Sequence, residues 1–145
     1  MPDVNQEPVH SLPVRIYYED TDAGGVVYHA NYIRFAERAR TEWLRTLGFE
    51  QRTLIHDHAL AFPVTNIRID YLKPARLDDA LEVVTWLADV GRATVRFRQE
   101  IQRGGIALAK LEVTVACVEL NPNDPVNPIG RVARIPEALY KRLAG

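Results

Sequence analysis

The residues best suited to chemistry lie in one short segment, YYEDTDAGGVVYHANY, which spans residues 17–32. Two of its acids, Asp20 and Asp22, directly precede the glycine pair Gly24–Gly25, and His29 follows. A carboxylate can act as a general base or as a nucleophile toward a carbonyl carbon. Adjacent glycines allow a substrate to approach the backbone closely. The segment therefore contains the groups needed for acyl transfer from an activated ester, with no metal and no cofactor.

The segment leads into the start of a predicted helix, which supplies the second part of this chemistry. The first backbone N–H groups of a helix have no internal acceptors and carry the positive end of the helix dipole. Such a terminus can stabilise the oxyanion that forms when a carbonyl is attacked. His29 and Tyr18 can orient a water, hold the carboxylate or steady the leaving group. The residues alone do not decide between Asp20 and Asp22, nor do they exclude a merely polar turn, because Asp favours turns and helix starts.

Other chemistries lack the residues that they require. The single serine, Ser11, is not in a G-x-S-x-G motif. The glycine pairs Gly24–Gly25 and Gly104–Gly105 do not have the spacing of a phosphate loop or a dinucleotide site. The cluster His56-Asp57-His58 has no third and fourth ligand at zinc spacing, so we interpret it as solvated loop residues. Cys117 lies in the apolar stretch VTVACVEL and is predicted to be a small buried residue rather than a nucleophile.

The composition predicts one ordinary globular domain. The chain has 145 residues, of which 47% are hydrophobic and 26% charged, with a net charge of -1. This charge gives no general attraction to nucleic acid or to acidic lipid. No apolar run approaches the ~20 residues that span a bilayer, and the N-terminus lacks the pattern of a secretory signal. We therefore predict a flexible leader at residues 1–12, a single domain at residues 13–145 and a cytoplasmic location.

One long amphipathic helix follows the reactive segment. Asn31 is its expected N-cap, and Gly48 its expected stop. The charged side is expected to be solvated, with weak pairs Glu37–Arg40 and Glu42–Arg45. The apolar residues recur at spacings of three and four, as a stripe facing a core requires: Tyr32, Ala36, Ala39, Trp43 and Leu47.

The remaining chain alternates with a period of two and predicts strands. Turns are expected at Gly91 and at Gly104–Gly105, residues 50–60 are expected to be a connection, and a short helix is expected at 136–143. The predicted strands, the last four joined by hairpins, are 14–18, 67–71, 81–90, 95–101 and 106–120. A five-stranded antiparallel sheet wrapped around one long helix is thus the expected α+β architecture. The strongly apolar segments 81–90 and 107–120 predict further burial by self-association, most simply in a two-fold dimer.

The segment YYEDTDAGGVVYHANYIRFAERAR strongly resembles the signature of the bacterial Tol–Pal-associated acyl-CoA thioesterases. These enzymes belong to the 4-hydroxybenzoyl-CoA thioesterase branch of the hotdog-fold superfamily. The likeness covers the first strand, the loop and the long helix, and it extends more loosely to about Leu120. It implies a hotdog fold, active sites at a dimer interface, and dimers that commonly associate into homotetramers.

The resemblance also implies a role for individual residues. Asp22 matches the catalytic aspartate, His29 contributes the backbone N–H that polarises the thioester oxygen, and Tyr18 helps to position the site. Asp20 is expected to be structural, and Glu37 is the runner-up acid because a neighbouring hotdog branch uses a helix carboxylate. The expected substrate-binding residues are Gly25, Val27 and Tyr28.

The expected function is therefore hydrolysis of an acyl-CoA to the free acid and CoA. An alternative is a hotdog module that binds acyl carrier protein in phospholipid or cell-envelope metabolism, with hydrolysis as a secondary activity. A hotdog dehydratase is a third hypothesis, which the loop acids disfavour because the acid of a dehydratase is expected on the helix. A binding assay with loaded carrier protein and a double-bond-forming assay would separate these alternatives.

Overall fold

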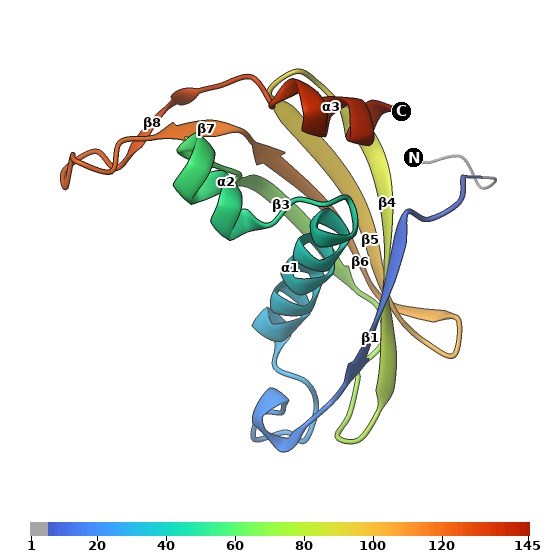
Figure 1. Ribbon diagram of the computed structural model, residues 1–145. Helices are drawn as coiled ribbons and strands as arrows, with labels where there is room; N and C mark the ends of the chain where they lie inside the picture. The colour runs from blue at the N-terminus through green and yellow to red at the C-terminus, as the bar shows by residue number, and fades with distance from the viewer. Residues whose placement is uncertain (1–5) are drawn as a thin grey trace.

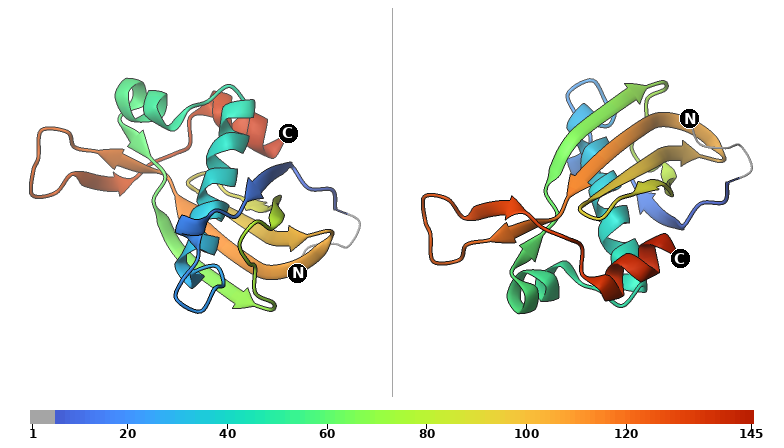
Figure 2. Two further views of the ribbon diagram at one scale, coloured as in Figure 1. Left: turned by 90° about the horizontal axis from the view of Figure 1, so that it is seen from below. Right: turned by 90° about the horizontal axis from the view of Figure 1, so that it is seen from above.

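An antiparallel sheet curves around one long helix in the computed structural model, which describes residues 6–145 (Figure 1). The strands of this sheet are, in spatial order, β1 (His10–Arg15), β4 (Ala80–Val90), β5 (Thr94–Arg103), β6 (Ile106–Ala116) and β3 (Val64–Tyr71). The helix that they enclose is α1 (His29–Thr46), and Figure 2 shows it lying along one face of the sheet. The predicted five-stranded hotdog architecture is thereby confirmed.

Smaller elements complete the fold. A 3-10 turn, η1 (Tyr18–Asp20), precedes α1, and two short helices follow it, α2 (Gln51–His58) and α3 (Glu137–Ala144). A second sheet consists of β2 (Leu60–Ala61), β7 (Val118–Leu120) and β8 (Ile129–Val132). The C-terminal helix begins at Glu137, one residue later than predicted, with Pro136 as its cap residue.

The predicted apolar stripe of α1 forms the core. Tyr32, Ala36, Ala39 and Trp43 are all buried, and Leu47 is partly buried against them. They pack on inward-facing strand residues such as Phe97, whose ring meets that of Trp43 edge to face at 5.7 Å. Gly48 follows the helix with φ +88, and the amides of Gly48 and Phe49 donate to Arg45 O and Leu44 O. This is the Schellman ending that a glycine at this position favours.

The sheet extends closer to the N-terminus than the sequence indicated. β1 pairs with β4 from His10↔Thr85 to Arg15↔Ala80, so it begins inside the predicted leader and ends before Tyr17. Pro13 is tolerated because β1 is an edge strand. Residues 1–5 of the predicted leader lie outside the described residues.

Three further predictions about the strands and connections are wrong. β3 does not form a hairpin with β4: it pairs with β6, so residues 72–79 connect strands that are not neighbours. Residues 51–58 form helix α2, and the histidine cluster His56-Asp57-His58 is exposed on its last turn rather than in a loop. The final strand is divided at Cys117, beyond which the chain joins the second sheet.

Arg40 is not on the solvated side of the helix as predicted. Its side chain is buried, and its Nη1 donates to Gln99 Oε1 at 2.9 Å. Burial lowers the pKa of Arg40, against the opposing effect of the Glu37 charge. Gln99 is itself fully buried and donates to Ala36 O and to Thr85 Oγ1, both at 3.0 Å. Arg40 follows Ala36 by four residues, so helical spacing places it beside the apolar stripe, and it was its charge that assigned it to solvent. Of the two predicted pairs, Glu42–Arg45 is formed at 3.4 Å.

Cys117 is fully buried, as its apolar context predicted, and desolvation raises its pKa to about 11. Alkylation by iodoacetamide at pH 8 should therefore be very slow in the native protein and fast in guanidinium chloride. The raised pKa also means that the stabilising contribution of the protonated thiol is fully present below the unfolded value of 9.0 and is lost as the pH rises through about 11. Rapid alkylation of the native protein at pH 8 would contradict this assignment.

Candidate active site

Asp20 anchors the loop between β1 and α1. Its Oδ2 accepts the N–H of Tyr17 at 2.8 Å, and its Oδ1 accepts Nδ2 of Asn31 at 3.0 Å. Its backbone carbonyl accepts the N–H of Tyr28 at 2.9 Å. Asp20 is buried, with both carboxylate oxygens engaged. These contacts tie the two ends of the loop together, which is the structural role expected for this acid.

Asn31 is therefore not the N-cap that the sequence predicted. The helix begins at His29, with Tyr28 as the cap residue three positions before Asn31 and no side-chain capping bond. Asn31 is buried in the first turn, where its side chain binds Asp20. Its amide is used to hold the loop rather than to cap the helix.

Asp22 lies outside this anchor, on an exposed turn of the loop. Its Oδ1 accepts the N–H of Gly24 at 2.8 Å, and its carbonyl accepts the N–H of Gly25 at 3.0 Å. Gly25 has φ +79, and a Cβ on Gly24 would lie 3.2 Å from Asp22 Oδ1, so both glycines suit this turn. Within residues 6–145, the second carboxylate oxygen, Oδ2, has no hydrogen-bond partner. Asp22 thus presents a fixed carboxylate with one free oxygen.

The connection between β3 and β4 supports the outer half of the loop. The N–H of Val27 donates to Ala75 O at 2.9 Å, and Val26 forms an isolated bridge with Arg76. Thr21 and Val27 form a second bridge across the loop itself. Val27 is buried by these contacts. The connection between β3 and β4 therefore holds the outer half of the loop, in addition to the contacts made by Asp20.

The N-terminus of α1 offers free amide donors at the end of this loop. Asn31 N–H donates to Tyr28 O at 2.9 Å, whereas the N–H groups of His29 and Ala30 have no acceptor in the described part of the chain. Beside them is a hollow of about 250 Å³, lined by Val27, His29 and Tyr32 on one side and by residues 71–74 on the other. A carbonyl oxygen placed there would meet the positive end of the helix dipole.

Tyr71, at the end of β3, is a site residue that the sequence reasoning missed. Its hydroxyl donates to His29 O at 2.7 Å. Its ring contacts those of His29 and Tyr32 edge-on, at centroid distances of 6.5 Å and 5.4 Å. Burial, followed by the neighbouring Tyr32, raises the pKa of Tyr71, which keeps this donor protonated. The contact joins residues 42 positions apart, and no local pattern reports it.

Three other residues from the sequence analysis, Tyr28, Tyr18 and Glu37, lie in different surroundings. The ring of Tyr28 packs on His29 at a centroid distance of 4.5 Å. Tyr18 is 82% exposed and forms no side-chain hydrogen bond within the described residues. Glu37 lies two turns further along α1 and accepts Thr41 Oγ1 at 3.1 Å, away from the loop.

Comparison with known proteins agrees with this architecture. A family model described as the Thioesterase superfamily matches residues 24–110. The Acyl-CoA thioesterase YbgC of Haemophilus influenzae is 55% identical over 116 residues, which cover 80% of this chain and 85% of that protein. The crystal structure of a probable thioesterase from Bartonella henselae superposes with a TM-score of 0.78 at 33% identity, covering 88% of this chain and 98% of that one.

A more distant structure shows how widely this fold is shared. A 4-hydroxybenzoyl CoA thioesterase mutant, solved with 4-hydroxybenzoyl CoA, has a TM-score of 0.81 but only 18% identity, covering 93% of this chain and 97% of that one. At this identity the likeness concerns the fold alone. By the family model and the close sequence relative together, the chain belongs to the thioesterase superfamily, with its hotdog fold.

Proposed function

We propose that this protein is an acyl-CoA thioesterase that uses Asp22 and the first amides of α1. The observation that carries the proposal is that one anchored loop holds the exposed Asp22 carboxylate in a fixed turn and leads directly into the free N–H groups of His29 and Ala30 at the start of α1. The Haemophilus influenzae relative is an acyl-CoA thioesterase, which supports acyl-CoA as the substrate class.

In the proposed reaction, the thioester oxygen accepts a hydrogen bond from the amide of His29. Asp22 either removes a proton from the attacking water or attacks the carbonyl carbon itself, forming an anhydride that water then hydrolyses. In both routes the C–S bond breaks, the thiolate leaves with its electron pair and takes up a proton, and the acid is released. A thiolate leaves readily, so one carboxylate and one oxyanion site are chemically sufficient.

Self-association and location form part of the same proposal. Tyr71 and Val64, at the two ends of the edge strand β3, are 47% and 41% exposed, and His29 is exposed beside its Tyr71 end. A two-fold pairing would cover these residues and enclose the hollow, with a homotetramer built from two such dimers.

No helix among residues 6–145 is both long and apolar enough to cross a membrane. A cytoplasmic location, expected from the composition, and a link to the Tol–Pal system, implied by the resemblance, complete the proposal.

A panel of short, long and aromatic acyl-CoAs, assayed for release of the free thiol, tests this function. We expect saturable turnover of at least one class. Negligible turnover across the panel, together with capture of a loaded acyl carrier protein, would instead support the binding module.

Tyr71→Phe is expected to lower kcat about two- to tenfold, the value of one ordinary hydrogen bond, with little change in KM. The reason is that the hydroxyl binds the carbonyl of His29 and so holds the first residue of α1, whose N–H is the candidate oxyanion donor. Steady-state kinetics at several substrate concentrations measure this effect. Tyr140→Phe, the same change on α3, serves as the control, and equal kinetics for the two variants would contradict a role for Tyr71.

A further inference from the structure

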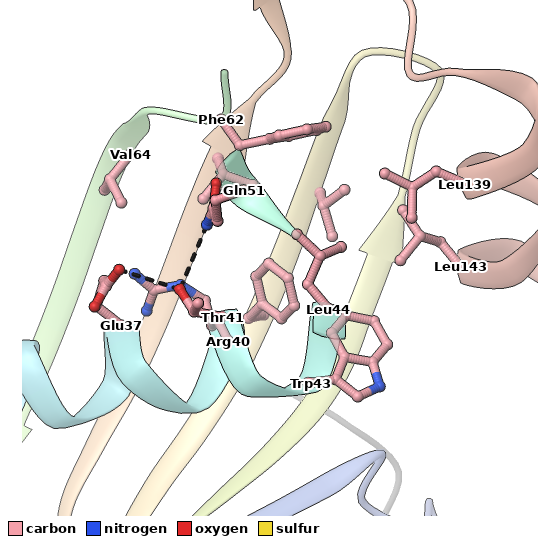
Figure 3. Close-up of a pocket in the computed structure, with 13 residues that line it drawn as sticks. Glu37, Arg40, Thr41, Trp43, Leu44, Gln51, Phe62, Val64, Leu139 and Leu143 are labelled. Carbon is pink, nitrogen blue, oxygen red and sulfur yellow. Dashed lines mark hydrogen bonds between the residues drawn. The ribbon is translucent and has the colours of Figure 1, made fainter. Parts of the chain in front are cut away.

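A second cavity lies between the C-terminal half of α1 and the sheet, away from the loop (Figure 3). Its volume is about 120 Å³. The leucines of α3 point toward it and close one end, as the close-up shows. Its main apolar lining comes from Trp43, Leu44, Phe62, Val95, Leu139 and Leu143.

Four polar side chains line this cavity, Glu37, Arg40, Thr41 and Gln51, and each forms a hydrogen bond. Gln51 Nε2 donates to Thr41 Oγ1 at 3.4 Å, and Thr41 Oγ1 donates to Glu37 Oε1 at 3.1 Å (Figure 3). The guanidinium of Arg40 donates to Gln99 outside the cavity lining. The remaining walls are apolar, so a hydrocarbon group suits the interior.

The cavity adjoins an outer depression of about 460 Å³ between α1, α2 and the second sheet. The two spaces share Glu37, Thr41, Gln51 and Phe62 in their linings. An elongated ligand can therefore lie in the depression and insert one end into the cavity. Glu37 is eight residues beyond His29 on α1, about 12 Å along the helix axis, so one helix carries both the candidate oxyanion amides and this entrance.

The size and lining of the cavity indicate the chemistry of its occupant. An unfilled apolar cavity lowers the stability of a fold, because its lining loses packing contacts. Apolar cavities of about 150 Å³ in proteins accept a benzene molecule. A space slightly smaller than that suits the last few carbons of an aliphatic chain.

We propose that this cavity holds the distal end of the acyl chain, and that Leu139 and Leu143 of α3 form the wall that limits its length. The inference rests on the proposed thioesterase function and names a feature of its substrate. The wall lies outside residues 24–110, which match the family model, so the length limit is set by a segment beyond that match.

Binding of straight-chain saturated fatty acids tests the proposal without any hydrolysis. Trp43 lines the cavity, so its fluorescence should report occupancy. We expect the dissociation constant to fall about fourfold with each added methylene until the cavity is full, and then to level off. Trp86→Phe leaves Trp43 as the single tryptophan of the chain and should keep the signal. A signal lost in Trp86→Phe, or affinity that does not depend on chain length, would overturn the proposal.

Variants of the wall locate the site. The levelling point is the chain length beyond which the dissociation constant no longer falls. Val95→Phe, which fills the cavity, should move it to shorter chains by at least one methylene. Leu143→Ala should move it to longer chains. Val132→Phe, at a residue 64% exposed on β8, is the matched control and should leave it unchanged. If Leu143→Ala does not fold, Val95→Phe still decides, and a folded Val95→Phe with an unchanged levelling point would refute the assignment.

The two proposals fail separately in this experiment. If acyl-CoA turnover is normal but the levelling point does not move in the wall variants, the cavity assignment is rejected and the proposed hydrolysis is unaffected. A levelling point that moves as expected, in a protein that hydrolyses no acyl-CoA, would reject the proposed hydrolysis and leave the cavity as an aliphatic-chain site.

Discussion

Asp22→Asn is expected to reduce the turnover of a good acyl-CoA substrate by about 10²–10⁴-fold, the usual contribution of a general base. The amide can still accept the N–H of Gly24 through its carbonyl oxygen, so the turn should persist. It can neither remove a proton from water nor form an anhydride. Initial rates of thiol release measure the loss, and circular dichroism checks that the variant is folded.

Glu19→Gln is the matched control for this result. Glu19 is an exposed acid in η1, three residues before Asp22, and it undergoes the same chemical change. We expect its turnover to stay within about twofold of wild type, since exposed substitutions away from special contacts have small effects. Equal losses in the two variants would mean that negative charge in the loop, rather than Asp22, is what matters.

Gln99→Leu is expected to cost about 2–4 kcal/mol of unfolding free energy, the largest stability effect that we predict. The change removes the acceptor of the buried Arg40 guanidinium and the donor that binds Ala36 O and Thr85 Oγ1. A buried charge left without its partner carries its full desolvation cost. Chemical denaturation at neutral pH measures the difference.

A double variant separates this explanation from a simple packing defect. Replacing both partners, as Arg40→Met with Gln99→Leu, removes the buried charge together with its acceptor, so at least half of the loss should be recovered. If the loss of unfolding free energy in the double variant instead equals the sum of the losses in the two single variants, Arg40 and Gln99 do not act as a pair. A cost below about 0.5 kcal/mol for Gln99→Leu would reject the buried network as a source of stability.

The sequence predicted the parts of the fold that have a clear local period. The apolar stripe from Tyr32 to Trp43 and the alternating strands follow from the helical and strand repeats, and their burial confirms them. Arg40 was misplaced because its charge outweighed its spacing from Ala36 and Trp43, which puts it beside the apolar stripe, where Gln99 supplies a buried partner. The pairing of β3 with β6 was missed because strand neighbours are a property of topology that adjacent sequence does not record.

The candidate site shows the same division. Local spacing identified the loop, and resemblance to a family chose Asp22 over Asp20. The hydrogen bonds of Asp20 to Tyr17 and Asn31 give that choice a physical basis, since they occupy both of its carboxylate oxygens. The contact of Tyr71 with His29 spans 42 residues and depends on how β3 lies beside α1, so no pattern near Tyr71 could indicate it. The helix start at His29 was missed because Asn31 is a typical cap residue that is used here to bind Asp20.

In the proposed hydrolysis Asp22 acts in the chemical step rather than in binding, and one paired measurement tests this role. For wild type and Asp22→Asn, kcat is measured by thiol release, and the affinity for a thioether analogue of the same acyl-CoA, which neither protein can hydrolyse, is measured by calorimetry. We predict that kcat falls by at least about 10²-fold while the affinity changes by less than about threefold. Near-wild-type turnover in Asp22→Asn, or a loss explained entirely by weaker binding, would contradict the account.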